Sequence, residues 1–434
     1  MIIVFKEKCE DIVIDLKNKF KSITIEEILE IKCIILKNEN NVMYNEVIKY
    51  IYSKFNNIIE TINECNIVSY IDSIIKCNDF KFESNELKKS RDNTIIKSSI
   101  EYTKLTWDVD LVTGRGKSYE IEEGDHFTKV AIIDSGIDLN HPDLKNNIIS
   151  CKIFTPNDNT IKDFTGHGTM IAGIIAANGN IKGIAPNIGL AIYKVFDCYN
   201  NCESEWLIKA IIEAANDGVD VINLSLSMYK SLLKEDEKNT ILAFKRTISY
   251  ARSKGCIIVA SAGSEKKGYN ISNVIELASN RGYNSDIQIH IPGGLEGIIT
   301  VSAVDRDGVF CDLSNYGNNI DICSPTGSLR YMQDDNKLIN ISYAAITTYP
   351  TYLSNNNTCE KGYIINFGGT SLATPKVSAT IALIISRYNK KFGIKPIQCD
   401  VEKFLYEGSI KNKNIPNMYF GYGCVNAENS LKLI

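Results

Sequence analysis

The sequence predicts an α/β protein whose larger part is a parallel sheet with helices on both faces, preceded by a small α+β unit. Between residues 130 and 260, apolar runs rich in β-branched residues alternate with helical patterns, as in repeated βαβ units. The first hundred residues mix short strands and helices without this repeat. With 434 residues, 44% of them hydrophobic, the chain can bury one large core and a smaller one.

Residues 1–77 form the small predicted unit, which contains no cluster of catalytic residue types. Its periodicity predicts strand Ile2–Phe5, helix Asp11–Phe20, strand Ile31–Leu36, helix Tyr44–Glu60 and strand Asn66–Ile71. Residues 78–106 are rich in Lys, Ser, Asn and Glu, which indicates a linker open to proteolysis. Arg91 and Glu101 are both candidate cleavage positions, and the sequence does not choose between them.

Residues 107–434 form the large predicted unit. Trp107-Asp108 and the glycine-flanked segment 114–119 indicate a surface arm that leads to the first core strand. The elements expected after it are strand Val130–Ile133, helix Gly168–Ala177, strand Leu190–Val195, helix Glu205–Asn216, strand Val219–Leu224, helix Thr240–Lys254 and strand Ile257–Ala260. Because open α/β sheets bind ligands beyond the carboxyl ends of their strands, we expect the functional site at that edge.

A candidate nucleophile lies in Asn366–Ala379, where a Gly-Gly pair, a Thr-Ser pair and a proline precede a long helical pattern. The glycines allow a sharp turn, and Pro375 suits a first helical turn. Ser371 would then lie at a helix N-terminus, where free N–H groups and the helix dipole favour developing negative charge. Such a serine also needs a base and an acid that orients the base.

Both partners are found far upstream. Asp134 follows the apolar run 130–133, and His167 begins a helix of small apolar residues in Thr-Gly-His-Gly-Thr. Taken singly, Asp134 could be a turn residue, His167 a helix-start histidine and Ser371 an N-cap. Together they stand in the order Asp, His, Ser, which the subtilisin version of the catalytic triad uses.

On these motifs the chain, from Trp107 to Ile434, resembles the subtilisin-like serine peptidases, or subtilases. The resemblance implies a subtilisin-like parallel sheet and hydrolysis of peptide bonds. Ser371 would be the nucleophile, His167 the general base and acid, and Asp134 the orienting carboxylate. It also implies that residues 1–77 are a propeptide, which assists folding, then acts as an intramolecular inhibitor, and is released by autoprocessing.

One position departs from the family pattern. The family places Asn after the Ala-Gly of Val259–Gly268, and its amide donates to the oxyanion, whereas this chain has Ser264. Losing that donor costs roughly 10²–10³ in rate in subtilisin. Asn270 is a candidate compensating donor. We expect reduced but not absent activity.

The resemblance also indicates substrate-binding residues. Segment Gly218–Ser227 matches the subtilase segment that pairs with the substrate backbone as an extra strand and walls the S1 pocket. The residues assigned to substrate binding are Ser225, Leu226, Ser227, Ala262 and Gly263. Glu265 could favour a basic P1 residue, Lys266 and Lys267 could oppose it, and solvated loop charges are a further interpretation of all three.

Segments 290–303, 313–317, 107–108 and 116–119 resemble the lantibiotic (lanthipeptide) leader peptidases, a subtilase branch. This resemblance predicts removal of the leader from a modified precursor peptide. Two alternatives are kept: a general intracellular subtilisin that cuts many proteins, and a pseudopeptidase that binds peptides with little turnover because of Ser264.

No cofactor is expected. Many subtilases insert a calcium loop after the catalytic His, but the corresponding segment, Ala176–Ile184, is short and lacks a carboxylate. Asp143 alone would not make a calcium site there, and a weaker site elsewhere stays open. The pair Cys198 and Cys202 has no second pair or nearby His, so free thiols are the preferred interpretation.

A net charge of -4 gives no support for nucleic-acid binding or for an anionic membrane surface. No apolar stretch has the length of a membrane span, and the N-terminus lacks the basic and apolar regions of a signal peptide. Thirteen scattered cysteines fit a reducing compartment. We therefore expect a cytoplasmic enzyme, with export by another route as the alternative.

Overall fold

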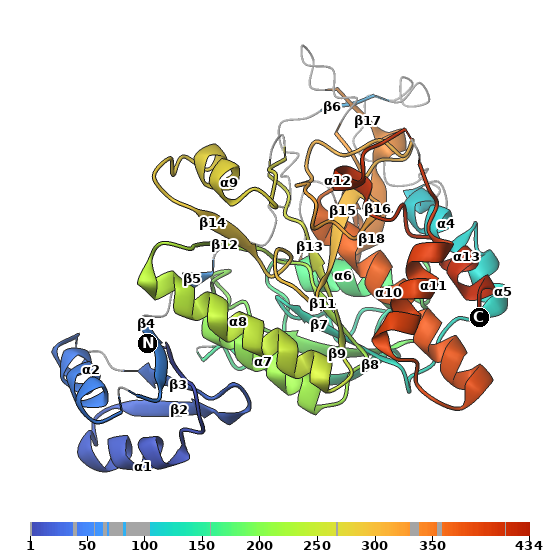
Figure 1. The fold of residues 1–434 in the computed structure, drawn as a ribbon. Coiled ribbons are helices and arrows are strands. Elements are labelled where there is room, and N and C mark those ends of the chain that lie inside the picture. Colours follow the sequence, from blue (N-terminus) through green and yellow to red (C-terminus); the bar gives the residue numbers. More distant parts are fainter. Residues whose placement is uncertain are drawn as a thin grey trace.

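The fold is that of a computed structural model (Figure 1). The structure describes residues 2–37, 41–55, 57–63, 67–68, 81–83, 105–156, 158–265, 268–329, 338–353, 358–412 and 414–434. The candidate cleavage positions Arg91 and Glu101, and the charges Lys266 and Lys267, lie outside the described residues.

A seven-stranded sheet forms the centre of the molecule, in the order β16-β15-β13-β11-β7-β9-β8. Every neighbouring pair in it is parallel. Its strands are β7 (Lys129–Asp134), β8 (Ile148–Ile153), β9 (Gly189–Lys194), β11 (Val221–Leu224), β13 (Ile257–Ser261), β15 (Ile299–Val304) and β16 (Ile322–Pro325). The four strands predicted from the sequence are β13, β11, β7 and β9, which are adjacent in the middle of the sheet, so the predicted parallel core is confirmed.

Helices cover both faces of this sheet. One face packs against α6 (His167–Ala176) and α10 (Thr370–Phe392), and the other against α7 (Ser204–Asn216) and α8 (Glu235–Ser253). Along β7, Val130 and Ile132 join the first core, whereas Ala131 and Ile133 join the second. This alternation explains why the strand is apolar at consecutive positions.

The remaining elements of the large unit are short. The helices are α4 (Trp107–Thr113), α5 (Lys117–Ile121), α9 (Val274–Asn280), α11 (Gln398–Gly408), α12 (Asn417–Phe420), α13 (Ala427–Lys432) and the 3-10 turn Ile341–Tyr343. Small sheets pair β12 (Met228–Ser231) with β14 (Gln288–Ile291), β20 (Tyr363–Asn366) with β18 (Ala345–Thr348) and β19 (Thr358–Glu360), and β17 (Leu338–Asn340) with β6 (Lys81–Glu83).

The surface arm expected at residues 107–119 is wrong in its first half. Residues 107–113 form α4, and Trp107 and Asp108 are both buried. The Trp107 indole N–H donates to the Ala344 carbonyl at 2.7 Å, and the Asp108 carboxylate pairs with Lys376. Both partners lie far along the chain, so local sequence could not reveal them.

The N-terminal unit is a four-stranded antiparallel sheet in the order β2-β3-β1-β4. Its elements are β1 (Ile2–Phe5), α1 (Glu10–Lys19), β2 (Thr24–Ile28), the 3-10 turn Leu29–Ile31, β3 (Cys33–Lys37), α2 (Asn41–Phe55) and β4 (Ile59–Asn63). One face, including Ile3 and Ile34, packs against α1 and α2. The opposite face, including Ile2 and Ile35, joins the core of α7 and α8, as their neighbouring positions in Figure 1 show.

The N-terminal elements differ from the expectation in three places. Strand β2 was not expected, since Glu26 and Glu27 interrupt its apolar pattern. The helix expected over 44–60 is α2, which ends at Phe55, and the residues from Ile59 belong to β4. The strand expected at 66–71 is the short β5 (Ile67–Val68), which pairs outside this sheet with β10 (Cys202–Glu203).

The described part of the chain has no helix that is both long enough and apolar enough to span a membrane.

Candidate active site

The three residues singled out by the sequence lie at the ends of three elements. Asp134 is the last residue of β7, His167 the first of α6 and Ser371 the second of α10. All three are buried. The parallel sheet thus presents a carboxylate at its carboxyl edge, and two helix N-termini carry the imidazole and the hydroxyl.

His167 is oriented by Asp134. Its Nδ1 lies 2.9 Å from each carboxylate oxygen of Asp134, which places a proton on Nδ1 in the hydrogen bond. The backbone N–H of Ser135 also donates to this carboxylate, at 2.7 Å. With Nδ1 as the donor, Nε2 is the basic nitrogen of the neutral ring.

A second carboxylate, missed from the sequence, holds the turn that carries His167. Buried Asp163 accepts hydrogen bonds from the Ser135 hydroxyl at 2.8 Å, the Gly166 N–H at 2.8 Å and the Thr169 N–H at 2.9 Å. Burial raises the pKa of Asp163, and the hydrogen bonds from these groups oppose that rise. One carboxylate therefore connects the residue after Asp134 to both sides of His167.

The start of α10 is arranged around Ser371. Gly368 and Gly369 have φ angles of 114° and 108°, which favour glycine, so the chain can turn sharply into the helix. Pro375 has no N–H to donate to the Ser371 carbonyl four residues earlier. The Ser225 hydroxyl donates to that carbonyl instead, at 2.8 Å. Ser225, predicted as a substrate-binding residue, thus contacts the serine backbone directly.

Ser264 lies beside the same helix start. Its hydroxyl accepts the Thr370 N–H at 2.7 Å and shares a 3.0 Å hydrogen bond with the Thr370 hydroxyl. A Cβ built on Gly369 would lie 3.4 Å from the Ser264 hydroxyl and 3.6 Å from the Ser371 hydroxyl, so both face the same side of that glycine. Ser264 is therefore next to Ser371, where a second oxyanion donor would be needed.

Asn270 is wrong as a compensating donor. Its amide donates to the Glu276 carboxylate at 3.3 Å, and its side-chain oxygen accepts the Ser272 hydroxyl at 2.7 Å. These contacts hold Asn270 at the start of α9.

The match to a known family model decides the identity of the chain. The model described as the subtilase family matches residues 125–423, which include all three residues of the site. The chain belongs to the subtilase family.

Two similar proteins and one similar crystal structure belong to the same kind of peptidase. The chain is 35% identical over 349 residues to the epidermin leader peptide-processing serine protease EpiP of Staphylococcus epidermidis, covering 75% of this chain and 74% of that protein. It is 33% identical to the nisin leader peptide-processing serine protease NisP of Lactococcus lactis subsp. lactis, covering 71% and 47%. The crystal structure of EpiP from Staphylococcus aureus superposes with a TM-score of 0.77 at 28% identity, covering 100% of this chain and 97% of that one.

As a subtilase, the chain is a serine endopeptidase. Its other predicted substrate-binding residues, Leu226, Ser227, Ala262 and Gly263, are buried at the carboxyl ends of β11 and β13. Within the segment Gly218–Ser227, the expected free edge is wrong for strand β11, because β7 and β13 already pair with its two sides. Pairing with a substrate peptide therefore falls to the residues that follow the strand. The strand that receives an added partner in the structure is β10, which the sequence did not reveal.

A polar cluster lies directly behind Gly263. Tyr229 and His290 are paired across β12 and β14, and a Cβ on Gly263 would lie 3.2 Å from the His290 Nε2 and 3.2 Å from the Tyr229 hydroxyl. The Glu265 carboxylate accepts the Tyr229 hydroxyl at 2.5 Å, and the Arg281 guanidinium lies 4.1 Å from the Tyr229 ring centre. Burial lowers the pKa of His290 to about 3, so this ring is neutral. Glu265 is therefore engaged within the protein, unlike the solvated charge that its sequence position suggested.

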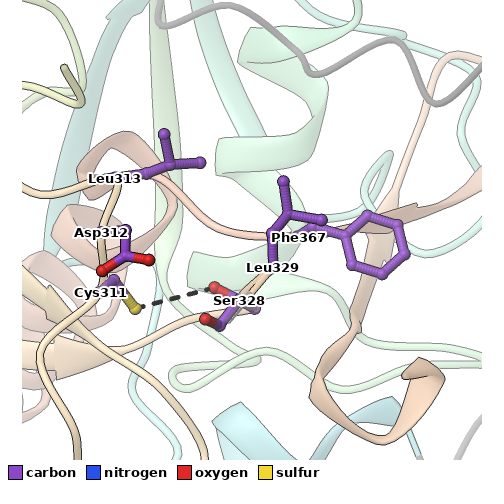
Figure 2. Close-up of a pocket in the computed structure, with 7 residues that line it drawn as sticks. Cys311, Asp312, Leu313, Ser328, Leu329 and Phe367 are labelled. Atoms are coloured by element: carbon purple, nitrogen blue, oxygen red, sulfur yellow. Dashed lines mark hydrogen bonds between the residues drawn. The ribbon is translucent and has the colours of Figure 1, made fainter. Parts of the chain in front are cut away.

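A small cavity of about 20 Å³ lies near the start of α10. It is lined by Cys311, Asp312, Leu313, Gly327, Ser328, Leu329 and Phe367. Figure 2 shows the Leu313, Leu329 and Phe367 side chains around it. Phe367 stands four residues before Ser371, and Leu313 and Leu329 follow the ends of β15 and β16. The side chains on this side of the site are thus mostly apolar.

The acidic residue considered for calcium is engaged by the protein itself. Asp143 accepts the Asn180 and Ile181 N–H groups, each at 3.1 Å, and the Tyr363 hydroxyl at 2.9 Å. In the described ranges no group of three His, Cys, Asp or Glu residues is arranged to hold a metal ion. Cys202 is buried in β10 and Cys198 is exposed.

Proposed function

We propose that this subtilase removes the leader peptide from a modified lanthipeptide precursor, with Ser371, His167 and Asp134 as its catalytic triad. The similarity to EpiP and NisP, which are named as leader peptide-processing proteases, supports the substrate. The observation that carries the chemistry is the contact of the His167 Nδ1 with both oxygens of Asp134 at 2.9 Å.

The roles follow from this geometry. Ser371 attacks the scissile carbonyl through its Oγ, and His167 Nε2 accepts the hydroxyl proton. The imidazolium then gives that proton to the leaving amine, and the Asp134 carboxylate stabilises its positive charge. In the second half of the reaction His167 takes a proton from water, and the water oxygen attacks the carbonyl of the acyl-enzyme. His167 then returns the proton to the Ser371 oxygen, which leaves. The oxyanion is held by the Ser371 N–H at the helix N-terminus and by the Ser264 hydroxyl.

Peptide would run along the carboxyl edge of the sheet. The strand ends occur in the order β9, β7, β11, β13, β15, β16, and the segment after β9 leads to β10. A peptide that enters beside β10 and passes Ser225–Ser227 and Ser264 leaves toward the ends of β15 and β16. The cavity of Leu313, Leu329 and Phe367 would then receive an apolar side chain on the leaving-group side of the scissile bond.

The N-terminal unit is the proposed intramolecular inhibitor. Arg246 of α8 donates to the Phe5 and Ile31 carbonyls at 2.8 and 2.9 Å and pairs with Glu60. Beyond this anchor, β5 pairs antiparallel with β10, as an added strand does in β-augmentation. Both contacts support an N-terminal unit that occupies the peptide path until it is cut away, and residues 78–106 are the proposed region of that cut.

We also propose that the enzyme acts inside the producing cell. The thirteen cysteines are scattered along the chain without the spacing of a disulfide framework, which fits a reducing compartment. Fractionation of the producing cells tests this proposal, since activity in the culture medium alone would favour export.

The experiment for the proposed function uses the full chain and the same chain with Ser371→Ala. Each is incubated with a modified lanthipeptide precursor and with unrelated peptides, and the products are identified by mass. We expect one cut, at the leader junction, by the unaltered chain only. Cuts throughout the unrelated peptides would favour a general protease, and precursor binding without cleavage would favour a pseudopeptidase.

A further inference from the structure

A buried lysine lies inside the helix that carries Ser371. Lys376 is fully buried in α10, and its ammonium group donates to the Leu372 carbonyl at 2.8 Å. The same ammonium lies 2.9 Å from the Asp108 carboxylate. Leu372 directly follows Ser371, so this cation is bonded to the residue next to the proposed nucleophile.

Asp108 comes from α4, a separate segment that is itself fixed. The Trp107 indole N–H donates to the Ala344 carbonyl at 2.7 Å, and the Asn426 amide donates to the Leu111 carbonyl at 3.1 Å. Asp108 is buried, and its second oxygen accepts the Val109 N–H at 3.0 Å. Helix α4 is thus attached at both ends, beside α13 as Figure 1 shows.

The first turn of α10 receives a side-chain donor at three successive carbonyls. The Thr374 hydroxyl donates to Thr370 at 2.7 Å, the Ser225 hydroxyl to Ser371 at 2.8 Å, and the Lys376 ammonium to Leu372 at 2.8 Å. Pro375 removes the backbone donor at the Ser371 carbonyl, where the Ser225 hydroxyl takes its place, and the other two side chains each add a donor to a neighbouring carbonyl. Of the three donors only the ammonium is charged, and a charged donor forms the stronger bond.

Stability alone does not account for this arrangement. Two buried charges lose their hydration, and apolar residues of similar volume often stabilise a fold as well or better. An ion pair also fixes the geometry of the groups that it joins, because the buried ammonium has to reach the Asp108 carboxylate and the Leu372 carbonyl at the same time. A pair fixed to α4 at one end and to the Leu372 carbonyl at the other restricts the rotation of the turn that presents Ser371.

We propose that Asp108 and Lys376 are positioning residues for the Ser371 nucleophile, and that α4 is the support against which this turn is held. The inference rests on the proposed role of Ser371. It requires that processing leave Asp108 on the enzyme, so the cut that frees the N-terminal unit falls before this residue. Both Arg91 and Glu101 meet that requirement.

The test compares the parent with the double variant Asp108→Asn/Lys376→Met, which leaves no unpaired buried charge. Full-length chains are brought to the parent's mature N-terminus with a trace of tagged parent enzyme, which is then removed. The measurements are kcat and KM on a peptide copied from the parent's own processing junction, the rate of Ser371 labelling by a fluorophosphonate, and thermal melting. We expect kcat and the labelling rate to fall at least tenfold, with KM within twofold and a melting transition that is retained.

The matched control is Lys390→Met, which removes an ion pair with Glu122 at the far end of the same helix. Its kcat and labelling rate should stay within twofold of the parent. A double variant that keeps the parent's kcat and labelling rate would overturn the proposal, as would equal losses in the control. If the double variant does not melt cooperatively, Asp108→Asn alone, which keeps an acceptor for Val109, is measured against the same limits. A parent whose Ser371 is not labelled would remove the proposed function and this inference together.

Discussion

Ser264 offers the most direct test of how the oxyanion is stabilised. Replacing it by Asn would place an amide donor where subtilases normally have one, beside Ser371. Such a donor is worth about 2.7–4 kcal/mol in the transition state. The replacement also removes the Ser264 hydroxyl donor, whose loss is about tenfold in kcat, or about 1.4 kcal/mol. The difference leaves a gain of about 1.3–2.6 kcal/mol, which is about tenfold in kcat at its lower end.

The assay follows initial rates on a peptide that spans the processing junction, for the parent, Ser264→Asn and Ser264→Ala. We expect Ser264→Asn to raise kcat about tenfold with KM little changed, since the oxyanion forms only in the transition state. Ser264→Ala removes the hydroxyl donor and should lower kcat by about tenfold. If the alanine variant keeps the parent's kcat and the asparagine variant gains nothing, position 264 does not contact the oxyanion, and the reasoning is refuted.

Three further predictions concern stability and release. Burial raises the pKa of Asp321 to about 6, so folding favours its protonated form, and the free energy of unfolding falls as pH rises from about 4 to 6. Asp321→Asn, which keeps an acceptor for the Thr300 N–H, should stabilise the fold by about 3 kcal/mol at pH 7.5 and little at pH 4. Denaturant titrations that show equal effects at both pH values would contradict this. Gly136 has φ 115°, and a Cβ at this position would collide with the Ile161 carbonyl. Gly136→Ala should therefore lower the free energy of unfolding by about 1–3 kcal/mol, measured by thermal melting, and slow catalysis. An unchanged melting temperature would mean that the turn after Asp134 accepts a side chain without strain. Arg246→Ala removes two hydrogen bonds to carbonyls and the ion pair with Glu60. The dissociation constant of the cleaved N-terminal fragment should therefore rise roughly 10–100-fold. Gel filtration of the cleaved mixture measures this, and an unchanged elution profile would argue against Arg246 as an anchor.

The parts of the structure that the sequence predicts are those governed by short-range rules. The four central strands were identified because each is a continuous apolar run, which a sheet covered on both faces requires. Asp134, His167 and Ser371 each stand at the boundary of an element, next to glycines that mark the turn. The sequence does not predict strand β8, because it lies at the edge of the sheet with no buried residue, and Ser150 and Lys152 interrupt its apolar pattern.

The contacts that the sequence does not predict join residues that lie far apart in the chain. The sequence predicts Asp108 on the surface, whereas its ion pair with Lys376, far along the chain, accounts for its burial. Likewise Asp163 has no motif of its own, and its function becomes visible only through the groups that donate to it. Strand β5 was expected, but its partner β10 is a two-residue segment that no periodicity marks. Local propensity cannot choose among such partners, because the choice is made when the sheet assembles.

The position of α10 also bears on how the enzyme is made. Asp134 and His167 are synthesised in the first half of the chain, whereas Ser371 lies within the last 64 of the 434 residues. All seven strands of the central sheet precede it. A ribosome that works from the N-terminus therefore produces the sheet, the base and the carboxylate well before the nucleophile. Translation products that stop short of Ser371 lack the attacking group and are chemically harmless, so the chemistry becomes possible only after the sheet, the base and the carboxylate have all been made.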